Sequence, residues 1–204
     1  MDARVFIYKA IRKVWRKLSA VVWRARTSAA FMASGVKYFD FRTTGVPIVK
    51  VAKDGNMSIG RGFVMNNGLA GNWIGSCEPC MFVVAKGCSL AIGDNVGISQ
   101  SALVACADIV VENNVKIGGG VAVFTTDFHS LDPVIRASPE DTAHKVCKPV
   151  RICEGAFIGA RSMILKGVTI GRNSIIGCAS VVTKSVPDNE IWAGNPAKFI
   201  RKVE

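Results

Sequence analysis

The sequence lacks several features that would each place it in a familiar class of protein. It contains no run of about 18 apolar residues, so we predict no membrane-spanning helix. Arg and Lys interrupt the apolar stretch of the N-terminus and no small-residue cleavage site follows it, so we expect no secretory signal. A Walker-type phosphate loop, a helix-turn-helix and an RNA-binding signature are also missing, which leaves nucleotide hydrolysis and nucleic-acid binding without support.

Metal ligands are scarce as well. The chain of 204 residues has only two histidines, His129 and His144. Cys77 and Cys80 form one CxxC pair, but a zinc site needs four ligands and no second pair supplies them, so we predict no metal site. The cysteines are odd in number and lack a framework spacing, which is typical of reduced thiols in a cytoplasm, and we interpret them as small packing residues. They are Cys77, Cys80, Cys88, Cys106, Cys147, Cys153 and Cys178.

Positive charge is concentrated at one end of the chain. The net charge is +11, and residues 1–26 hold eight Lys or Arg against the single acid Asp2, which is +7. The remaining residues therefore carry only 11 − 7 = +4. Because the charge belongs to a terminal segment and not to a groove, we predict no nucleic-acid partner.

The basic segment, residues 1–34, is predicted to be an amphipathic helix. Ile7, Ile11, Val14, Leu18 and Val21 recur at spacings of four and three, with basic residues on the opposite face. Such a helix can lie on an anionic membrane surface, which would place the protein at the inner face of the cell membrane. Alternatively, its apolar stripe packs on the rest of the protein or on a neighbouring subunit. The sequence leaves both interpretations open.

From residue 59 onward the hydrophobic period is six. The clearest run has six aliphatic residues at unbroken six-residue spacing: Ile152, Ile158, Ile164, Ile170, Ile176 and Val182. The same period appears upstream in two phases that differ by one residue, Ile92, Ile98 and Val104, and then Val111, Ile117 and Val123, with a weaker start at Ile59 and Met65. A fixed internal period is the mark of a solenoid.

We predict an all-β fold in which each hexapeptide forms one short strand of a triangular coil. Its aliphatic residue points into the prism, and three hexapeptides complete a turn, so residues 18 apart stack on one another. Ile152 should lie on Ile170, and Ile158 on Ile176. The expected β-helix spans residues 35–204 and follows the N-terminal helix.

A break in the repeat marks the candidate active site. His129 lies six residues after Val123, where the next coil should place an aliphatic residue, and the repeat resumes only at Ile152. The segment between, residues 129–149, carries three prolines and mixed charge without a period. Because a long loop ejected from a compact solenoid is usually functional, we predict His129 as a general base and His144 as a surface residue. Asp127 could orient the ring or contact the acceptor.

The pattern resembles the hexapeptide-repeat acyltransferases, whose β-helix is left-handed. The most specific segments are IGRNSIIG at 170–177, VTKSVP at 182–187 and AGNPAKFIR at 193–201, and HSLDPVIR at 129–136 is similar to the active-site segment of the maltose and galactoside O-acetyltransferase branch. The resemblance implies an acetyl-CoA-dependent O-acetyltransferase that acts on a sugar hydroxyl in surface polysaccharide biosynthesis. It also implies a homotrimer with coenzyme A along the groove between subunits.

Contacts to coenzyme A carried over from this family fall on Ala160, Cys178, Thr183, Lys184, Lys198 and Arg201. The cations among them suit the phosphates of coenzyme A. Two departures from the family exist: Cys178 stands where Ala is usual, and the coil SQSALVACAD at 99–108 has no match for the Asn and Asp that bind sugar. The acceptor is therefore predicted to be neither maltose nor galactoside.

Three alternatives follow from the same resemblance. An N-acetyltransferase for an amino sugar, or an acetyltransferase for an antibiotic, would use the same base and donor. A γ-type carbonic anhydrase shares the coil but needs three histidine ligands, one more than this chain has. A non-catalytic scaffold would not need a histidine at the break or a basic tail.

Overall fold

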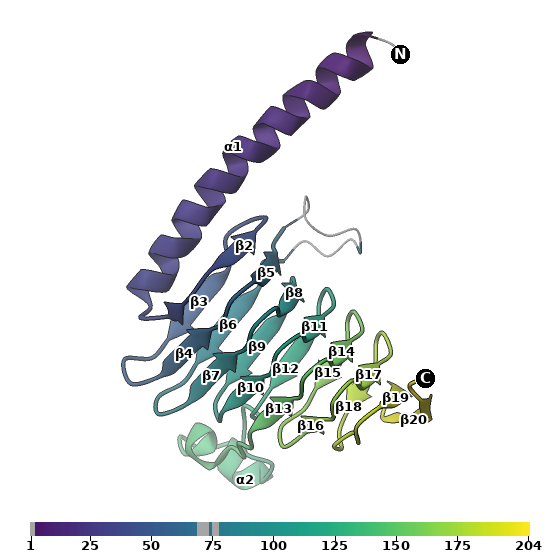
Figure 1. Cartoon of the computed structure of the whole chain (residues 1–204). Helices are drawn as coiled ribbons and strands as arrows, with labels where there is room; N and C mark the ends of the chain where they lie inside the picture. Colours follow the sequence, from purple (N-terminus) through teal and green to yellow (C-terminus); the bar gives the residue numbers. More distant parts are fainter. Residues whose placement is uncertain (1–2, 69–73, 75–77) are drawn as a thin grey trace.

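The computed structural model describes residues 3–68, 74 and 78–204 and consists of one long helix followed by a three-sided β-helix (Figure 1). The helix, α1, spans Ala3–Ala33, and Gly35 follows it in the left-handed region at φ +67°. Ser34 and Gly35 therefore end the helix. The first strand begins two residues later, so the coils begin before residue 59, where the six-residue period becomes readable.

Three sheets form the sides of the prism. The first contains β1 (Lys37–Tyr38), β4 (Asn56–Ile59), β7 (Ser89–Ile92), β10 (Ile109–Val111), β13 (Val150–Ile152) and β16 (Thr169–Ile170). The second contains β2 (Phe41–Thr43), β5 (Phe63–Asn66), β8 (Gly97–Ser99), β11 (Lys116–Ile117), β14 (Phe157–Ile158), β17 (Ile175–Ile176), β19 (Glu190–Gly194) and β20 (Ala197–Lys202). The third contains β3 (Ile48–Val51), β6 (Met81–Val84), β9 (Ala102–Ala105), β12 (Ala122–Phe124), β15 (Met163–Ile164) and β18 (Val181–Val182). Neighbouring strands are parallel except β19 and β20, which form an antiparallel hairpin at the C-terminal end.

The predicted stacks are confirmed by the strand register. Ile152 pairs with Ile170 and Ile158 with Ile176, and each of these four side chains is fully buried. Each aliphatic residue therefore contacts its equivalent in the next coil, and these contacts form one continuous core. Burying such side chains supplies most of the favourable free energy of folding, at about 1.5–3 kcal/mol each.

One predicted core position is wrong. Val104 is only partly buried, and Leu103 points into the prism in its place. The reason is a short corner: Leu103 follows Ile98 by five residues, whereas their register partners Ile117 and Val123 are six apart. Gln100, in the left-handed region at φ +45°, makes this tight turn.

The cysteines only partly meet their predicted role as packing residues. Cys80 is fully buried, and its burial raises the pKa of the thiol to about 11. Cys178 is exposed, and Cys88, Cys106, Cys147 and Cys153 are partly buried. Cys77 lies outside the described residues. Within the described ranges, no cluster of three or more His, Cys, Asp or Glu side chains could hold a metal ion.

Glycine is required where neighbouring corners touch. A Cβ atom on Gly159 would lie 2.6 Å from both the Cys178 amide nitrogen and the Ile176 carbonyl oxygen. We expect Gly159→Ala to force these coils apart and to lower the free energy of unfolding by about 1–3 kcal/mol. Gly97→Ala is the matched control, because its Cβ would meet only the flexible Lys116 side chain, at 3.2 Å. Urea titration of both variants is the measurement; equal midpoints would contradict this close-packing explanation.

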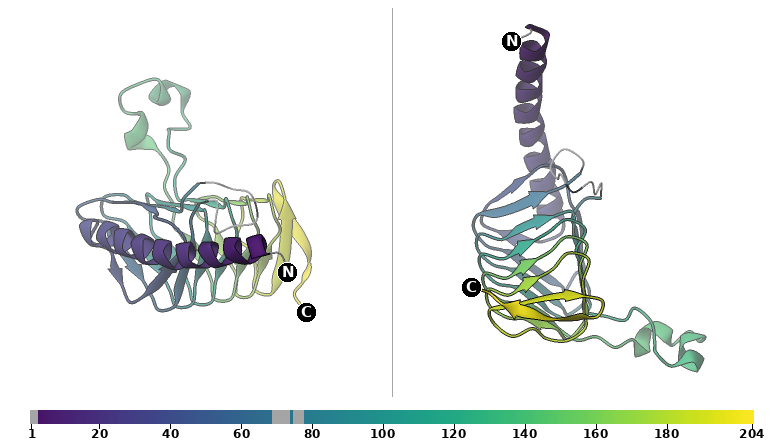
Figure 2. Two further views of the ribbon diagram at one scale, coloured as in Figure 1. Left: turned by 90° about the horizontal axis from the view of Figure 1, so that it is seen from above. Right: turned by 90° about the vertical axis from the view of Figure 1, so that its right-hand side faces the viewer.

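Two elements lie outside the prism. The chain between β12 and β13 leaves the prism as a projecting loop that carries α2 (Pro133–Arg136) and the 3-10 helix η1 (Asp141–His144). Helix α1 rises away from the coils on another side (Figure 2). No helix in the described part of the chain is both long and apolar enough to cross a membrane.

Candidate active site

The projecting loop leaves the prism at the corner between the third and first sheets. β12 ends at Phe124 and β13 begins at Val150, so the departure starts a few residues before His129. An antiparallel bridge between Thr126 and Cys147 closes the root of the loop, and the Lys148 N–H donates to the Thr125 carbonyl at 2.9 Å. His129 is therefore anchored close to the β-helix, although the rest of the loop extends into solvent.

The backbone before His129 is unusual. Phe128 has φ +66°, a left-handed conformation that costs a bulky residue free energy and needs support from its surroundings. Its N–H donates to Thr126 Oγ1 at 3.0 Å, and its ring packs edge-on against Phe124 at 5.3 Å between centroids. These two contacts hold the turn that directs His129.

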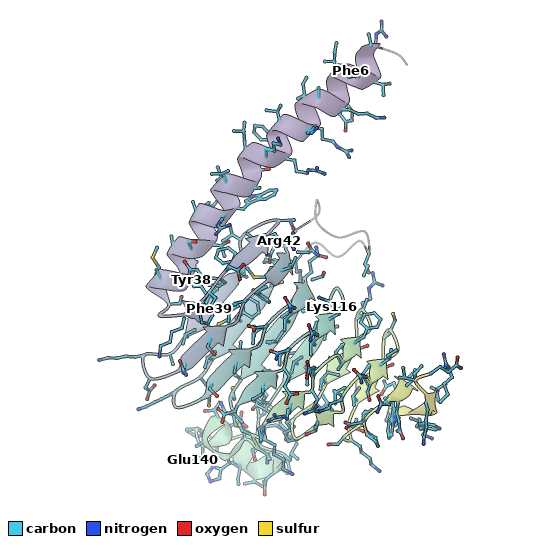
Figure 3. The ribbon with its side chains drawn as sticks, viewed as in Figure 1. Phe6, Tyr38, Phe39, Arg42, Lys116 and Glu140 are labelled. Carbon is cyan, nitrogen blue, oxygen red and sulfur yellow. The ribbon has the colours of Figure 1, made fainter. Side chains whose placement is uncertain are left out.

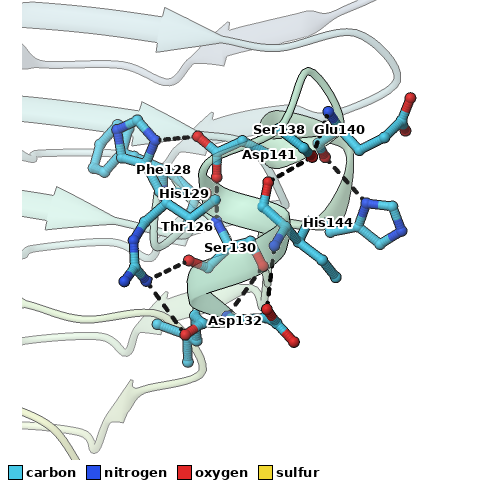
Figure 4. A network of polar contacts seen from close by, with 12 residues as sticks. Thr126, Phe128, His129, Ser130, Asp132, Ser138, Glu140, Asp141 and His144 are labelled. Carbon is cyan, nitrogen blue, oxygen red and sulfur yellow. Dashed lines mark hydrogen bonds and ion pairs between the residues drawn. The ribbon is translucent and has the colours of Figure 1, made fainter.

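Asp141 fixes the orientation of the His129 ring. His129 Nδ1 lies 2.6 Å from Asp141 Oδ2, while Asp141 Oδ1 accepts the Ser130 N–H at 2.7 Å (Figure 4). Since an ionised carboxylate only accepts hydrogen bonds, we assign a proton to Nδ1, which leaves Nε2 with a free lone pair. The bond from His129, and next that from Ser130, lower the pKa of Asp141 below its ordinary value and so favour the ionised form.

The loop is internally braced around this pair. Asp132 caps α2 by accepting the Val134 and Ile135 N–H groups, at 2.8 and 3.1 Å. Arg136 donates from its guanidinium to the Ser130 carbonyl at 2.9 Å. The histidine ring itself remains open to an incoming molecule, since its side chain is 64% exposed against 15% for Asp141.

Asp127 and His144, the two other residues that the sequence points to near the active site, have contacts of their own. Asp127 pairs with Lys166, its Oδ1 lying 2.5 Å from Nζ, so the carboxylate bound to His129 is that of Asp141. The second oxygen of Asp127 is buried without a hydrogen-bond partner among the described residues. His144 is exposed, and its Nδ1 lies 3.0 Å from the Glu140 carbonyl oxygen.

The residues assigned to coenzyme A fall into three places. Thr183, Lys184 and Lys198 line one hollow of about 230 Å³, together with Trp192, Pro196, Ala197 and Phe199. Ala160 and Cys178 lie at a different corner, where successive coils stack and the Ala179 N–H donates to the Ala160 carbonyl at 2.8 Å. The Arg201 guanidinium contacts Glu204 at 3.1 Å and is not among the residues that line the hollow.

One edge of the prism connects the hollow to the histidine. The loop follows β12, Lys166 follows β15, and Thr183 and Lys184 follow β18; these three strands are neighbours in the third sheet. The root of the loop, Lys166 and the hollow therefore occupy successive coils along the same corner.

Comparison with known proteins agrees with this architecture. The family model "Bacterial transferase hexapeptide (six repeats)" matches residues 149–184. A Saccharomyces cerevisiae protein, "Putative acetyltransferase YJL218W", is 35% identical over 137 residues, 64% of this chain and 67% of the yeast protein. The galactoside O-acetyltransferase of Lactococcus lactis is 39% identical over 101 residues, which is 50% of this chain but only 46% of that enzyme.

Solved structures resemble the fold along most of its length. A maltose O-acetyltransferase from Clostridium difficile has a TM-score of 0.57 at 22% identity and covers 100% of this chain and 90% of its own. AntD, an N-acyltransferase from Bacillus cereus in complex with dTDP and coenzyme A, has a TM-score of 0.66 at 19% identity, covering 87% and 88%. These likenesses confirm the left-handed parallel β-helix. With the yeast protein matched over two thirds of its length, the chain belongs to the hexapeptide-repeat acetyltransferases.

Proposed function

We propose that the protein is an acetyl-CoA-dependent O-acetyltransferase that acts on a sugar hydroxyl, with His129 as general base. One observation carries the proposal: His129 is held through Nδ1 by Asp141 while its ring stays exposed at the root of the loop. A histidine fixed in this way presents Nε2 as a proton acceptor, which is the group that direct transfer from a thioester requires.

In the proposed reaction His129 Nε2 accepts the proton of the acceptor hydroxyl as its oxygen attacks the thioester carbonyl carbon. The C–S bond then breaks, and His129 returns the proton to the departing thiolate of coenzyme A. Asp141 stabilises the imidazolium between these two events, because its carboxylate accepts a hydrogen bond from Nδ1–H throughout the reaction. The thioester is already activated, so the chain needs no covalent nucleophile of its own.

The hollow at the C-terminal end supports a site for the donor. Lys184 and Lys198 offer two cations beside the apolar surface of Trp192 and Phe199. Coenzyme A combines negatively charged phosphates with an adenine ring, and this combination fits charge-assisted hydrogen bonds next to an apolar wall. We propose that Arg201 lies at the outer end of this site. Ala160 and Cys178, at a different corner of the prism, would contact the pantetheine arm across the groove between two subunits.

Replacing both lysines of the hollow should weaken donor binding. We expect Lys184→Ala combined with Lys198→Ala to raise the Kd for coenzyme A by about 10- to 100-fold at low salt, because each lysine contributes a charge-assisted contact. The difference from the parent protein should shrink as salt is added. Lys86→Ala combined with Lys116→Ala removes the same charge away from the hollow and is the control. Equal affinity of all three proteins in calorimetry would rule out this donor site.

The proposed acceptor is a sugar hydroxyl of a surface polysaccharide precursor. The galactoside O-acetyltransferase relative supports oxygen as the attacking atom. The likeness to an N-acyltransferase is at 19% identity and concerns the fold alone. Acetyl-CoA is made inside cells, so we assign the activity to the cytoplasm.

We also propose that the active enzyme is a homotrimer. The loop presents Leu131 and Val134 to solvent, with 70% and 77% of their surfaces exposed. A neighbouring subunit that covered these apolar side chains would remove their surface from water, which is favourable. Such a contact would also bring His129 to the groove between two copies of the chain.

A further inference from the structure

Helix α1 attaches to the β-helix through one face of its last turns. Thr27 and Phe31 are fully buried there. The Phe31 ring packs on Tyr38 and Phe41, with centroids 5.5 and 5.3 Å apart, and the Arg24 guanidinium lies over the Phe41 ring at 5.7 Å. The attachment is therefore aromatic and specific.

The apolar stripe lies on the opposite face of the same helix. Thr27 follows Leu18 by nine residues, which at about 100° per residue places it half a turn away around the helix axis. The stripe residues Ile7, Ile11, Val14, Leu18 and Val21 are 55–71% exposed. The face that carries the stripe stays exposed even where α1 packs on the β-helix. Met32 is 67% exposed there, while its neighbour Phe31 is buried.

This arrangement excludes one of the partners that the sequence leaves open for the stripe, which is the rest of its own chain. Among the described residues, the stripe does not pack on its own chain. The contacts between α1 and the β-helix are made by the opposite face of the helix, which carries Thr27 and Phe31. The free part of α1 projects away from the coils, with side chains such as Phe6 in open space (Figure 3). The stripe therefore needs an external partner or remains in water.

The charge on α1 selects between the external partners. The helix contains no Asp or Glu, and its basic residues are Arg4, Lys9, Arg12, Lys13, Arg16, Lys17, Arg24 and Arg26. Four of them, Lys9, Arg12, Lys13 and Arg16, surround a hollow of about 230 Å³ on the polar face. A bundle of such helices would gather like charges with no acid to pair them, which opposes self-association.

A lipid surface fits both faces at once. Tyr8 and Trp15 lie at one border of the stripe, a position that aromatic side chains favour between acyl chains and headgroups. Anionic headgroups would neutralise the cations. We infer that α1 binds the surface of an anionic lipid bilayer, with the stripe in the acyl region and the β-helix on the aqueous side. This inference does not depend on acetyl transfer.

Vesicle binding by the full chain tests it. The parent protein should co-sediment with vesicles of 70% phosphatidylcholine and 30% phosphatidylglycerol at least tenfold more strongly than with phosphatidylcholine alone, and added salt should reduce this difference. Leu18→Gln combined with Val21→Gln should weaken binding at least tenfold, because two apolar side chains no longer enter the bilayer. Ser19→Gln combined with Ala20→Gln, the same change off the stripe, should bind within twofold of the parent.

Two results would overturn the inference. Equal loss in both Gln pairs would mean that the stripe makes no apolar contact with lipid. A parent protein that ignores anionic vesicles, together with a lower assembly mass for the Leu18 and Val21 variant in light scattering, would show that the stripe joins copies of the chain. Circular dichroism of each variant checks that the fold is intact, which we expect because none of the four positions is buried.

Discussion

His129→Ala is expected to lower kcat for acetyl transfer by about 10²–10⁴-fold, because the acceptor hydroxyl loses the group that takes its proton. The His129 side chain is 64% exposed, so folding and coenzyme A binding should survive its removal. Steady-state release of free thiol, with coenzyme A affinity measured in parallel, separates these effects.

The second histidine provides the matched control for this variant. His144 belongs to the same loop and is also exposed, but its Nδ1 lies 3.0 Å from a backbone carbonyl, that of Glu140, and not from a carboxylate. We expect His144→Ala to keep kcat within about threefold of the parent. Near-parental turnover by His129→Ala would remove the proposed base, and equal losses in both variants would indicate damage to the loop instead.

Asp141→Asn is expected to lower kcat by about 10²–10⁴-fold while KM for acetyl-CoA changes little. Asp141 uses one oxygen for His129 and the other for the Ser130 N–H, whereas an amide has only one oxygen. If that oxygen accepts from Ser130, the amide NH₂ faces Nδ1, and the ring proton moves to Nε2, where it blocks the base. Asp141 is thus a positioning residue, and ¹⁵N spectra of the His129 ring report the change of tautomer.

Asp132→Asn is the control for this change. Asp132 caps α2 in the same loop, and Asn is an equally good cap, so activity should stay close to that of the parent. If Asp141→Asn kept both full activity and the Nδ1 tautomer, the contact with His129 would have no role in catalysis.

The six-residue period predicts most of the β-helix because each repeat carries its own core residue. The stacks of Ile152 on Ile170 and Ile158 on Ile176 follow directly from the spacing. The period points to Val104 instead of Leu103 because the corner before β9 is one residue shorter, and both residues are apolar. Where two neighbouring residues could both face inward, only the length of the corner decides between them.

Long-range partners inside the loop could not be predicted in the same way. His129 stands out because it interrupts the period, but Asp141 lies twelve residues later among other acids such as Asp132 and Glu140. No spacing rule selects one of them, because the loop has no regular geometry. The direction of the α1 stripe was undetermined for a related reason: the sequence shows which face is apolar, but only the burial of Thr27 and Phe31 shows which face meets the domain.

The most direct measurement follows the acetyl group itself. The purified chain is incubated with acetyl-CoA and a panel of oligosaccharides and nucleotide sugars, and each acceptor is examined by mass spectrometry before and after hydroxylamine treatment. We expect an acceptor to gain one acetyl group as coenzyme A is released, to lose it in hydroxylamine as an ester does, and to gain none with His129→Ala. A hydroxylamine-resistant amide would contradict O-acetylation, and equal product from His129→Ala would contradict the assignment of the base.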